Sequence, residues 1–389
     1  MAIKGVNHKK AHPPLALMLL GDSEKDANML YATRVFVPDP FVFIQVRGKK
    51  YILIHEMEHA RVKKEACVDR VFSYGEASGL FGGGKSVPMD VAGVCAAFLK
   101  SRGVERIAVP RAFPLAFADD LRSKGFVVFA RQDPYFPDRA RKDEVEARQI
   151  RRSLLAAEYG MKAAFEALAK STIDRTRKGV LRLGKEILTS ERMRFLIHKA
   201  ILEKSCHAVH TIVSCGKRGC DPHYRGEGPL YGNEPIIVDI FPRSEITGYY
   251  GDLTRTFVKG RASERVLTMY HTVDEAQRLA ISMLKPGLEA SRVHKAVCDF
   301  FSRRGFPREE KNGRLSGFIH GTGHGLGLDI HEHPAIGERP GRITEGNVVT
   351  VEPGLYYPDL GGVRLEDVVW ITRGGAQRLS RFPHRLEID

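Results

Sequence analysis

The chain has 389 residues, of which 43% are hydrophobic and 28% are charged, and its formal net charge is +14. This length predicts two domains that can each bury an ordinary core, and the composition excludes a disordered or low-complexity protein. The basic residues are spread over mixed-sign stretches such as RKDEVEARQIRR, which is typical of a solvated helix face. No stretch combines basic and aromatic residues, so we do not expect nucleic-acid binding as the main role.

We expect a cytoplasmic protein without a membrane segment. The apolar run LALMLL near the N-terminus is too short for a membrane span and lacks the flanks of a signal peptide. The six cysteines have no disulfide-framework spacing, which predicts a reducing compartment. They are Cys67, Cys95, Cys206, Cys215, Cys220 and Cys298.

Strands and helices alternate over the first third of the chain. The runs FVFIQV and YILI, with a turn at 47–49, predict a β-hairpin. A helix, a strand, a helix and a strand then follow in MDVAGVCAAFLKSRG, IAVP, FPLAFADDLRSKG and FVVFA. Pro134 and Pro137 mark a boundary. We therefore predict an α/β domain over residues 1–137 and a second domain over residues 138–389.

Two patterns in the first region match enzyme motifs. His55 and His59 fit HExxH, in which two histidines on one helix face bind zinc. His55 directly follows the strand YILI, so we interpret this pattern as a strand end with a polar helix start. Residues 79–86, GLFGGGKS, fit the phosphate-binding P-loop, but the preceding GEAS is polar and is no buried strand. We expect a flexible loop here that faces the other domain or another subunit.

The second region opens with a long amphipathic helix, predicted from about residue 143 to 168. Further helices are predicted in SERMRFLIHKAILEKS, SERVLTMYHTVDEAQRLAISML and SRVHKAVCDFFSRRG, the last with Gly305 as its C-cap. Strands separate them, and HRLEI predicts a closing strand, so an α+β arrangement is expected. Cys215, Cys220 and His223 resemble part of a zinc site. No fourth ligand is evident, so we do not expect zinc to bind there.

Acids and histidines gather on strands and glycine-rich turns in the last 150 or so residues. Asp239 ends the strand PIIVD, and Asp252 lies in GYYGDLTRTF. The pair is predicted to lie directly opposed on a β-hairpin, with both side chains on one face. His320, His324, His331 and His333 are interleaved with glycines in HGTGHGLGLDIHEHP, and glycine lets the backbone come close to a ligand.

Two further acids complete the pattern. Glu352 ends the apolar run NVVTV, and Arg364 and Glu366 alternate with apolar residues, so both are predicted on one face of a strand. The predicted ligands are one imidazole and four carboxylates, from Asp239, Asp252, His324, Glu352 and Glu366. Four ionised carboxylates are too much negative charge to bury alone, so we predict two divalent metal ions. This ligand set favours manganese or cobalt, with iron or zinc as alternatives.

These motifs resemble the pita-bread metallopeptidases, which include aminopeptidase P, prolidase and methionine aminopeptidase, with metal-free creatinase as a relative. The likeness is carried by Asp239, DLTRTF, HGTGHGLGLDIHEHP, VEPGLYY and GGVRLEDV, and by DPHY, in which His223 matches the substrate-side histidine of the family. It extends more weakly through the N-terminal region. The resemblance implies an α+β pita-bread catalytic domain, a smaller α/β creatinase-like N-terminal domain, and a homodimer.

The chain also departs from the family pattern. Phe241 and Pro242 stand where the family usually has a glycine two positions after its first aspartate. The hairpin is about two residues longer than in the family, an extension that keeps Asp252 on the same face. We expect these changes to affect substrate choice more than metal binding.

The resemblance implies hydrolysis of the Xaa-Pro amide bond in dipeptides or short peptides, by a water that bridges two metal ions. It implies that Glu352, a metal ligand, takes and passes on the proton. It also implies that His223 and His331 stabilise the tetrahedral intermediate or hold the substrate, and that Arg364 orients Asp252 or the substrate. The N-terminal domain favours the prolidase branch. The added bulk near the ligands, which includes Phe241, favours either dipeptides or another substrate altogether, and we expect short peptides.

His320 and His333 are candidates for orienting the ligands. Two other classes of function stay open. One is another enzyme on the same scaffold, either a creatinase-like C–N hydrolase or a metal-dependent lyase. The other is a non-catalytic binding protein. Creatinase lacks the metal set and binding relatives typically lose ligands, whereas all five ligands are present here.

Overall fold

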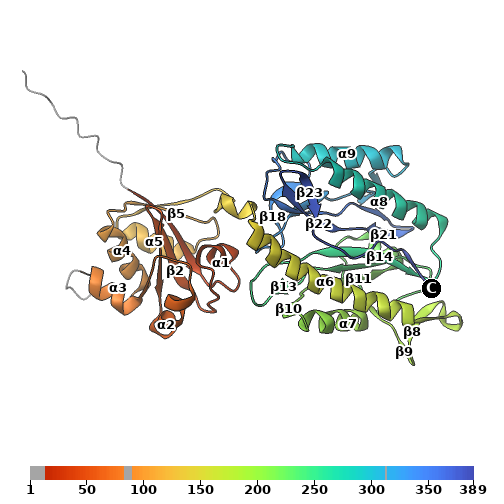
Figure 1. Cartoon of the computed structure of the whole chain (residues 1–389), viewed down its shortest axis with the longest axis horizontal. Coiled ribbons are helices and arrows are strands. Elements are labelled where there is room, and N and C mark those ends of the chain that lie inside the picture. Colours follow the sequence, from red (N-terminus) through yellow and green to blue (C-terminus); the bar gives the residue numbers. More distant parts are fainter. Residues whose placement is uncertain (1–13, 83–89, 312) are drawn as a thin grey trace, which may run out of the picture. The chain divides into compact units, whose positions relative to one another are not determined.

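The structure is a computed structural model that describes residues 14–82, 90–311 and 313–389. The chain divides into two units, Met1–Pro137 and Asp138–Asp389, and each is described by itself (Figure 1). The last part of the P-loop-like stretch, residues 83–86, lies outside the described residues.

The first unit is built on a six-stranded sheet with the order β4-β3-β2-β1-β5-β6. The pairs β1–β2 and β2–β3 are antiparallel and the other pairs are parallel. Its strands are β1 (Leu15–Gly21), β2 (Phe41–Val46), β3 (Lys49–Ile54), β4 (Arg70–Ser73), β5 (Arg106–Val109) and β6 (Val127–Ala130). Its helices are α1 (Ala27–Thr33), α2 (Glu56–Glu65), α3 (Tyr74–Phe81), α4 (Val91–Ser101) and α5 (Leu115–Ser123).

This sheet is buried on both faces, which explains its continuous apolar strands. Phe41 and Phe43 belong to one core cluster, whereas Val42 and Ile44 belong to another. The predicted hairpin between β2 and β3 is confirmed. The predicted α/β class of this region is confirmed as well.

Both histidines of the HExxH pattern form hydrogen bonds with backbone groups. β3 ends before His55 and α2 begins after it, so His55 is the N-cap and its ring accepts a hydrogen bond from the Met57 N–H. His59 lies one turn along the helix, and its Nε2 donates to the Val71 carbonyl at 3.3 Å. The pattern is therefore a strand end followed by a helix start, as interpreted from the sequence.

The second unit contains two larger sheets, with the orders β11-β12-β14-β24 and β18-β17-β19-β22-β23, and several short strand pairs. Its first strands are β7 (Thr172–Asp174), β8 (Val180–Leu183), β9 (Glu186–Ile187), β10 (Cys206–His207), β11 (Ile212–Cys215), β12 (Ile236–Ile240), β13 (Arg243–Ser244), β14 (Leu253–Lys259), β15 (Glu309–Lys311) and β16 (Arg314–Ser316). The remaining strands are β17 (Gly323–Gly325), β18 (Glu332–Ile336), β19 (Val348–Val351), β20 (Gly354–Tyr357), β21 (Gly361–Arg364), β22 (Asp367–Thr372), β23 (Gly375–Arg378) and β24 (Glu387–Ile388).

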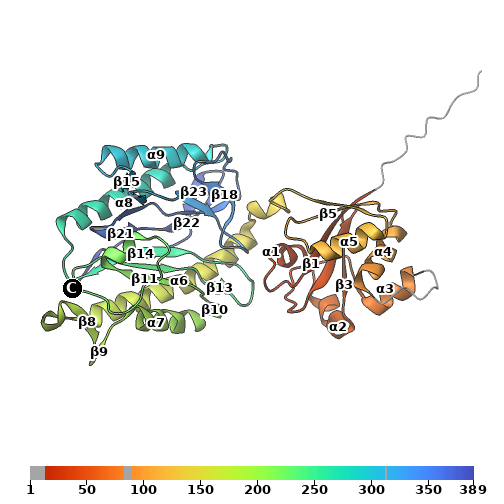
Figure 2. The ribbon, with the colours of Figure 1, turned by 180° about the vertical axis from the view of Figure 1, so that it is seen from behind.

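Two helix pairs cover these sheets. They are α6 (Glu144–Lys170) with α7 (Ser190–Leu202), and α8 (Glu264–Met283) with α9 (Ala290–Arg303). Figures 1 and 2 both show the strands running between the two pairs. Met161 and Ile197 pack in one core with Val238 of β12, whereas Val273 and Val297 pack in another with β19 and β22. The α+β prediction for this region is confirmed.

The helix ends follow the local sequence. α6 begins at a capping box, in which Asp143 accepts from the Glu146 N–H at 2.8 Å and Glu146 accepts from the Asp143 N–H at 3.2 Å. The last turn of α9 ends with Arg304 as its C-cap, followed by Gly305 at a φ of 81°. The predicted C-cap was thus one residue too far along, because the glycine occupies the left-handed position after the cap.

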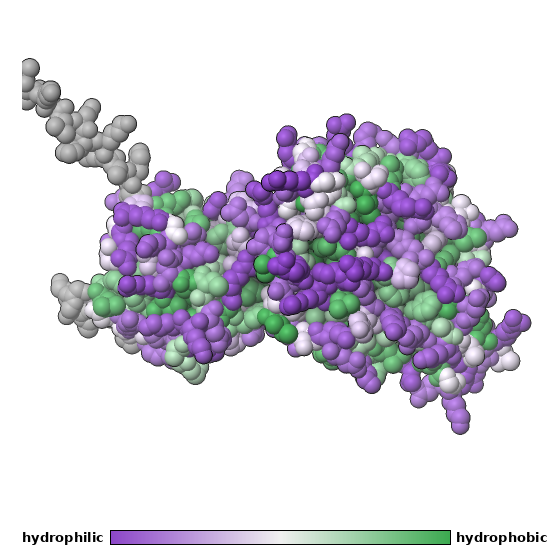
Figure 3. Space-filling view, in the orientation of Figure 1, coloured by the Kyte–Doolittle hydropathy of each residue, from purple (hydrophilic) through white to green (hydrophobic). Residues whose placement is uncertain are grey.

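Hydrophilic side chains cover most of the face of the second unit that Figure 3 shows, with small apolar areas between them. Within the described residues, no helix has both the length and the apolar character needed to cross a bilayer.

Candidate active site

A cavity of about 730 Å³ lies in the second unit. It brings together every residue that was predicted for the site. These residues are His223, Asp239, Asp252, His324, His331, Glu352, Arg364 and Glu366, and His320 and His333 line the same cavity.

The two aspartates come from neighbouring strands. Asp239 lies on β12 and pairs with Thr254 of β14, whereas Asp252 immediately precedes β14. The aspartates are therefore diagonal neighbours and not directly opposed as predicted. The offset is two residues, so both side chains still point to the same face, and both are buried.

His324 lies on β17, which is paired between β18 and β19 in the five-stranded sheet. The glycines beside it are required by close backbone approach. A Cβ atom at Gly323 would lie 2.0 Å from the Thr350 carbonyl oxygen, and one at Gly325 would lie 2.5 Å from that of His333. The His324 Nδ1 donates to the Gly325 carbonyl at 3.1 Å, because a carbonyl can only accept. Burial lowers the pKa of His324, so its Nε2 carries a free lone pair.

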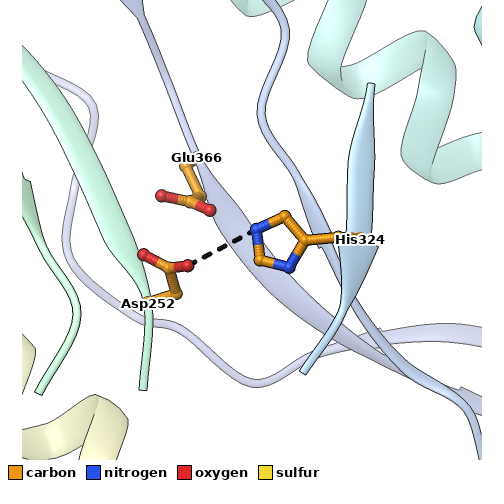
Figure 4. A group of neighbouring side chains, drawn as sticks. All are labelled: Asp252, His324 and Glu366. Carbon is orange, nitrogen blue, oxygen red and sulfur yellow. Dashed lines mark ion pairs between the residues drawn. The ribbon is translucent and has the colours of Figure 1, made fainter. Parts of the chain in front are cut away.

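That lone pair faces carboxylates (Figure 4). The His324 Nε2 lies 3.6 Å from Asp252 Oδ2 and 3.4 Å from Glu352 Oε1. Asp252, His324 and Glu366 each offer one ligand atom, and these atoms lie within 4.8 Å of one another. Lone pairs that face each other without a proton between them repel, whereas a cation placed among them would be bound by all of them.

Glu366 occupies an unexpected position. β21 ends at Arg364 and β22 begins at Asp367, so Glu366 lies in the short connection between the two strands. The prediction that Arg364 and Glu366 share a strand is therefore wrong, although both line the cavity. The pairing of β21 with β20 ends at Arg364, and the Glu366 N–H donates to the Thr254 carbonyl at 3.1 Å.

Thr254 links the two ends of the acidic cluster. Its hydroxyl lies 2.9 Å from Asp239 Oδ1 and 2.8 Å from Glu366 Oε2. One hydroxyl has one proton and can donate to only one of these carboxylates at a time. The second contact therefore needs either a protonated carboxyl or a cation that holds the two carboxylates together.

Arg364 is bonded to Asp239 and forms no hydrogen bond with Asp252, which was one of its two predicted partners; the other, the substrate, stays a prediction. Its Nη2 donates to Asp239 Oδ2 at 2.7 Å, and its Nη1 donates to the Tyr356 hydroxyl at 2.8 Å. The Tyr356 hydroxyl lies 2.9 Å from His320 Nε2, and His320 Nδ1 lies 2.8 Å from the Gly321 carbonyl. Burial lowers the pKa of His320 to about 3, so the neutral ring accepts from Tyr356 and donates to Gly321.

The acids cannot all be ionised without cations. Burial first, and then the carboxylates of Glu366 and Asp239, raise the pKa of Asp252 well above its usual range. Burial and Glu352 raise the pKa of Glu366 in the same way. Burial raises the pKa of Glu352 to about 7, although Arg364 opposes the rise. A buried cluster of this kind fits bound divalent cations, whose charge would keep all the carboxylates ionised.

Three more of the predicted histidines line the cavity, and so does His210, which was not predicted. The His331 ring is 4.3 Å from that of His324, centroid to centroid, in a T-shaped arrangement. Partial burial of its ring lowers the pKa of His331, although the residue as a whole is exposed, as are His223 and His333. All three line the cavity. The histidines thus reach the cavity from three separate segments.

Sequence reasoning missed a buried ion cluster beside His331. Glu332 accepts from Arg139 Nη2 at 2.5 Å and from Lys142 Nζ at 2.6 Å, and also from the Leu328 and Asp329 N–H groups. Arg139 and Lys142 directly precede α6, about 190 residues earlier in the chain. In the sequence, the only signal for Glu332 is its place between two histidines of the glycine-rich and histidine-rich motif.

A second buried ion cluster lies behind Glu366. His384 Nδ1 lies 2.7 Å from Asp274 Oδ1, and its Nε2 lies 3.1 Å from Asp367 Oδ2. Burial alone would lower the pKa of His384, but the hydrogen bonds to Asp274 and Asp367 outweigh burial and raise the pKa above its ordinary 6.5. A protonated ring donates to both carboxylates, whereas a neutral ring donates to one.

This arrangement predicts a pH-dependent stability. A raised pKa stabilises the fold fully below about pH 6.5, and the contribution is lost as the pH rises through the folded value. We expect His384→Gln to lower Tm by about 2–4 °C near pH 6, the effect of about 1 kcal/mol in a unit of this size. Thermal denaturation between about pH 5.5 and 9 measures this, and the difference from wild type should shrink at the alkaline end. A difference that stays constant with pH would contradict the prediction.

Comparison with known proteins adds a family to this geometry. Residues 148–373 match the model of metallopeptidase family M24. The chain belongs to that family. An Xaa-Pro dipeptidase from Pyrococcus horikoshii is 28% identical over 288 residues, which cover 73% of this chain and 75% of that protein. One from Pyrococcus furiosus is 35% identical over 181 residues, which cover 46% of this chain and about half (49%) of the relative.

The M24 fold extends over nearly the whole chain. The crystal structure of an X-Pro aminopeptidase from Thermotoga maritima superposes with a TM-score of 0.79 at 20% identity, and covers 97% of this chain and 98% of that one. The predicted pita-bread fold with an additional N-terminal domain is therefore confirmed. As M24 metallopeptidases use divalent metal ions, the acidic cavity of this member is the candidate metal centre.

Proposed function

We propose that this M24 member hydrolyses the Xaa-Pro amide bond of dipeptides or short peptides with two divalent metal ions. The observation that carries the proposal is a cavity in which one unprotonated imidazole nitrogen faces four buried or half-buried carboxylates. The names of the relatives, Xaa-Pro dipeptidases, supply the substrate class. A homodimer and a cytoplasmic location belong to the proposal on the sequence grounds given above.

The residues that would hold the ions are Asp239, Asp252, His324, Glu352 and Glu366. When bound, divalent ions make a water acidic enough to attack an amide near neutral pH, and they polarise the scissile carbonyl. The oxygen-rich ligand set favours manganese or cobalt over zinc or iron. Arg364 and Thr254 hold Asp239 in its orientation, because both contact its carboxylate.

The chain's own groups supply the proton transfer and the substrate contacts. Glu352 takes the proton from the attacking water and delivers it to the leaving nitrogen, a task that a carboxylate on the cavity wall can perform. His331 and His223 line the cavity and donate to the developing oxyanion or to the substrate. Phe241 lines the same cavity and narrows it toward small substrates.

A substrate panel tests the proposal. With manganese or cobalt added, we expect cleavage of Xaa-Pro dipeptides and, more slowly, of Xaa-Pro-Yaa tripeptides, because Phe241 adds bulk beside the metal ligands. The peptide Met-Ala-Ser and creatine should stay intact. Liquid chromatography of the products measures each reaction. Cleavage of Met-Ala-Ser or creatine with every proline substrate untouched would overturn the assignment.

A further inference from the structure

The cavity wall carries one arginine whose guanidinium is already bonded and one whose guanidinium is free. Two arginines line the cavity among the described residues, Arg225 and Arg364. The guanidinium of Arg364 is buried and bonded to Asp239 and Tyr356. Arg225 is exposed, and its guanidinium forms no hydrogen bond or ion pair with any part of the chain that the structure describes.

The backbone beneath Arg225 is nevertheless firmly held. The Arg225 carbonyl accepts from the Val213 N–H at 3.0 Å and from Arg194 Nη1 at 2.7 Å. Arg194 Nη1 also donates to the Gly226 carbonyl at 2.9 Å. Gly226 has a φ of 81°, and a Cβ atom there would lie 1.7 Å from the Val213 carbonyl oxygen. A free cation is thus presented from a fixed base at the cavity wall.

The proposed substrates carry a group that this guanidinium can bind. In an Xaa-Pro dipeptide the free carboxylate belongs to the proline itself, and one extended residue spans only about 3.3–3.6 Å. The carboxylate therefore enters the cavity together with the scissile amide. Five acidic side chains line the cavity, and none of them can serve as the counter-charge of this carboxylate. They are Asp239, Asp252, Glu332, Glu352 and Glu366.

We propose that Arg225 binds the C-terminal carboxylate of the dipeptide and so favours dipeptides over longer peptides, an inference that rests on the proposed function. The planar guanidinium matches a carboxylate in a bidentate contact. A longer peptide has a neutral amide at this position and gains nothing from the contact. The same contact would hold free proline, which is the product that keeps the carboxylate.

Kinetics with matched substrates test this assignment. We expect Arg225→Gln to raise KM for Ala-Pro about tenfold with kcat nearly unchanged, in the range of a lost charge-assisted contact. KM for Ala-Pro-amide, which lacks the carboxylate, should not change. Inhibition by proline should weaken by a similar factor, whereas inhibition by prolinamide should not. Arg225→Lys, which keeps the charge without the planar fork, should give an intermediate KM.

Arg373→Gln is the matched control, because the Arg373 side chain is 90% exposed, pairs with Glu345 and does not line the cavity. It should leave all these constants unchanged. Suppose that wild type cleaves Ala-Pro and that Arg225→Gln leaves the ratio of the KM values for Ala-Pro and Ala-Pro-amide unchanged. This result would overturn the role of Arg225 but not the proposed function. A wild-type protein that cleaves no Xaa-Pro substrate would overturn the proposed function, and this inference with it.

Discussion

Asp252→Asn is expected to abolish hydrolysis while the protein stays folded. Residues that merely orient metal ligands contribute about 10–100-fold to activity or affinity, so loss of a ligand should lower kcat/KM by more than about 100-fold. The amide is nearly isosteric with the carboxylate, but it removes a charge that faces His324 and Glu366. Steady-state kinetics and metal content after gentle purification measure both effects.

The same substitution is expected to preserve or increase the thermal stability of the metal-free protein. In wild type without metal, Asp252 is buried beside other carboxylates that raise its pKa. A neutral amide relieves this repulsion, so in the presence of a chelator the variant should melt at or above the wild-type Tm. Added manganese should raise Tm in wild type more than in the variant. Asp299→Asn, at a half-exposed residue paired with Lys295, is the control. Near wild-type turnover in Asp252→Asn would refute the metal-ligand assignment.

Arg255→Met is expected to cause the largest loss of stability. Arg255 and Asp367 are both about 1% exposed and form an ion pair at 2.9 Å. The guanidinium also donates to the carbonyls of Thr254 at 2.9 Å and Glu366 at 2.6 Å, among others. Removing one partner of a buried pair costs about 3–5 kcal/mol, which corresponds to a Tm lower by about 6–20 °C. Thermal denaturation measures the change.

An exposed ion pair provides the comparison for Arg255→Met. Arg261 is 78% exposed and pairs with Glu387 at 2.8 Å. Arg261→Met should therefore cost less than about 1 kcal/mol. Equal effects of the two substitutions would show that burial does not govern the Arg255–Asp367 pair. A further expected consequence of Arg255→Met is weaker metal binding, because Arg255 holds the backbone of Glu366.

The ligand residues could be predicted because each sits in a short motif whose residue types and spacing have a chemical meaning. Asp239 lies on a buried strand, and His324 stands between glycines that only close packing explains. The partners of these ligands could not be predicted. Arg364 contacts Asp239 across 125 residues of chain, and no local pattern shows which acid an arginine will meet. Of the two partners predicted for Arg364, Asp252 and the substrate, Asp252 was wrong for that reason.

The register of the hairpin could not be predicted from the sequence either. Alternation predicts on which face Asp252 lies, but it does not predict which residue lies opposite. That depends on where the chain turns between β12 and β14. Thr254 takes the position opposite Asp239. Its hydroxyl is therefore the group that touches both Asp239 and Glu366.

The Glu332 cluster has a consequence for where the catalytic unit can be cut from the chain. The capping box at Asp143 has the appearance of a natural start for α6 and for a shortened fragment. A fragment that begins there would lose Arg139 and Lys142 and leave Glu332, whose side chain is only 6% exposed, without a counter-charge. An unpaired buried carboxylate costs about 3–5 kcal/mol. The segment that leads into α6 is thus needed for the stability of the catalytic unit. A stable fragment of this unit should therefore begin before Arg139.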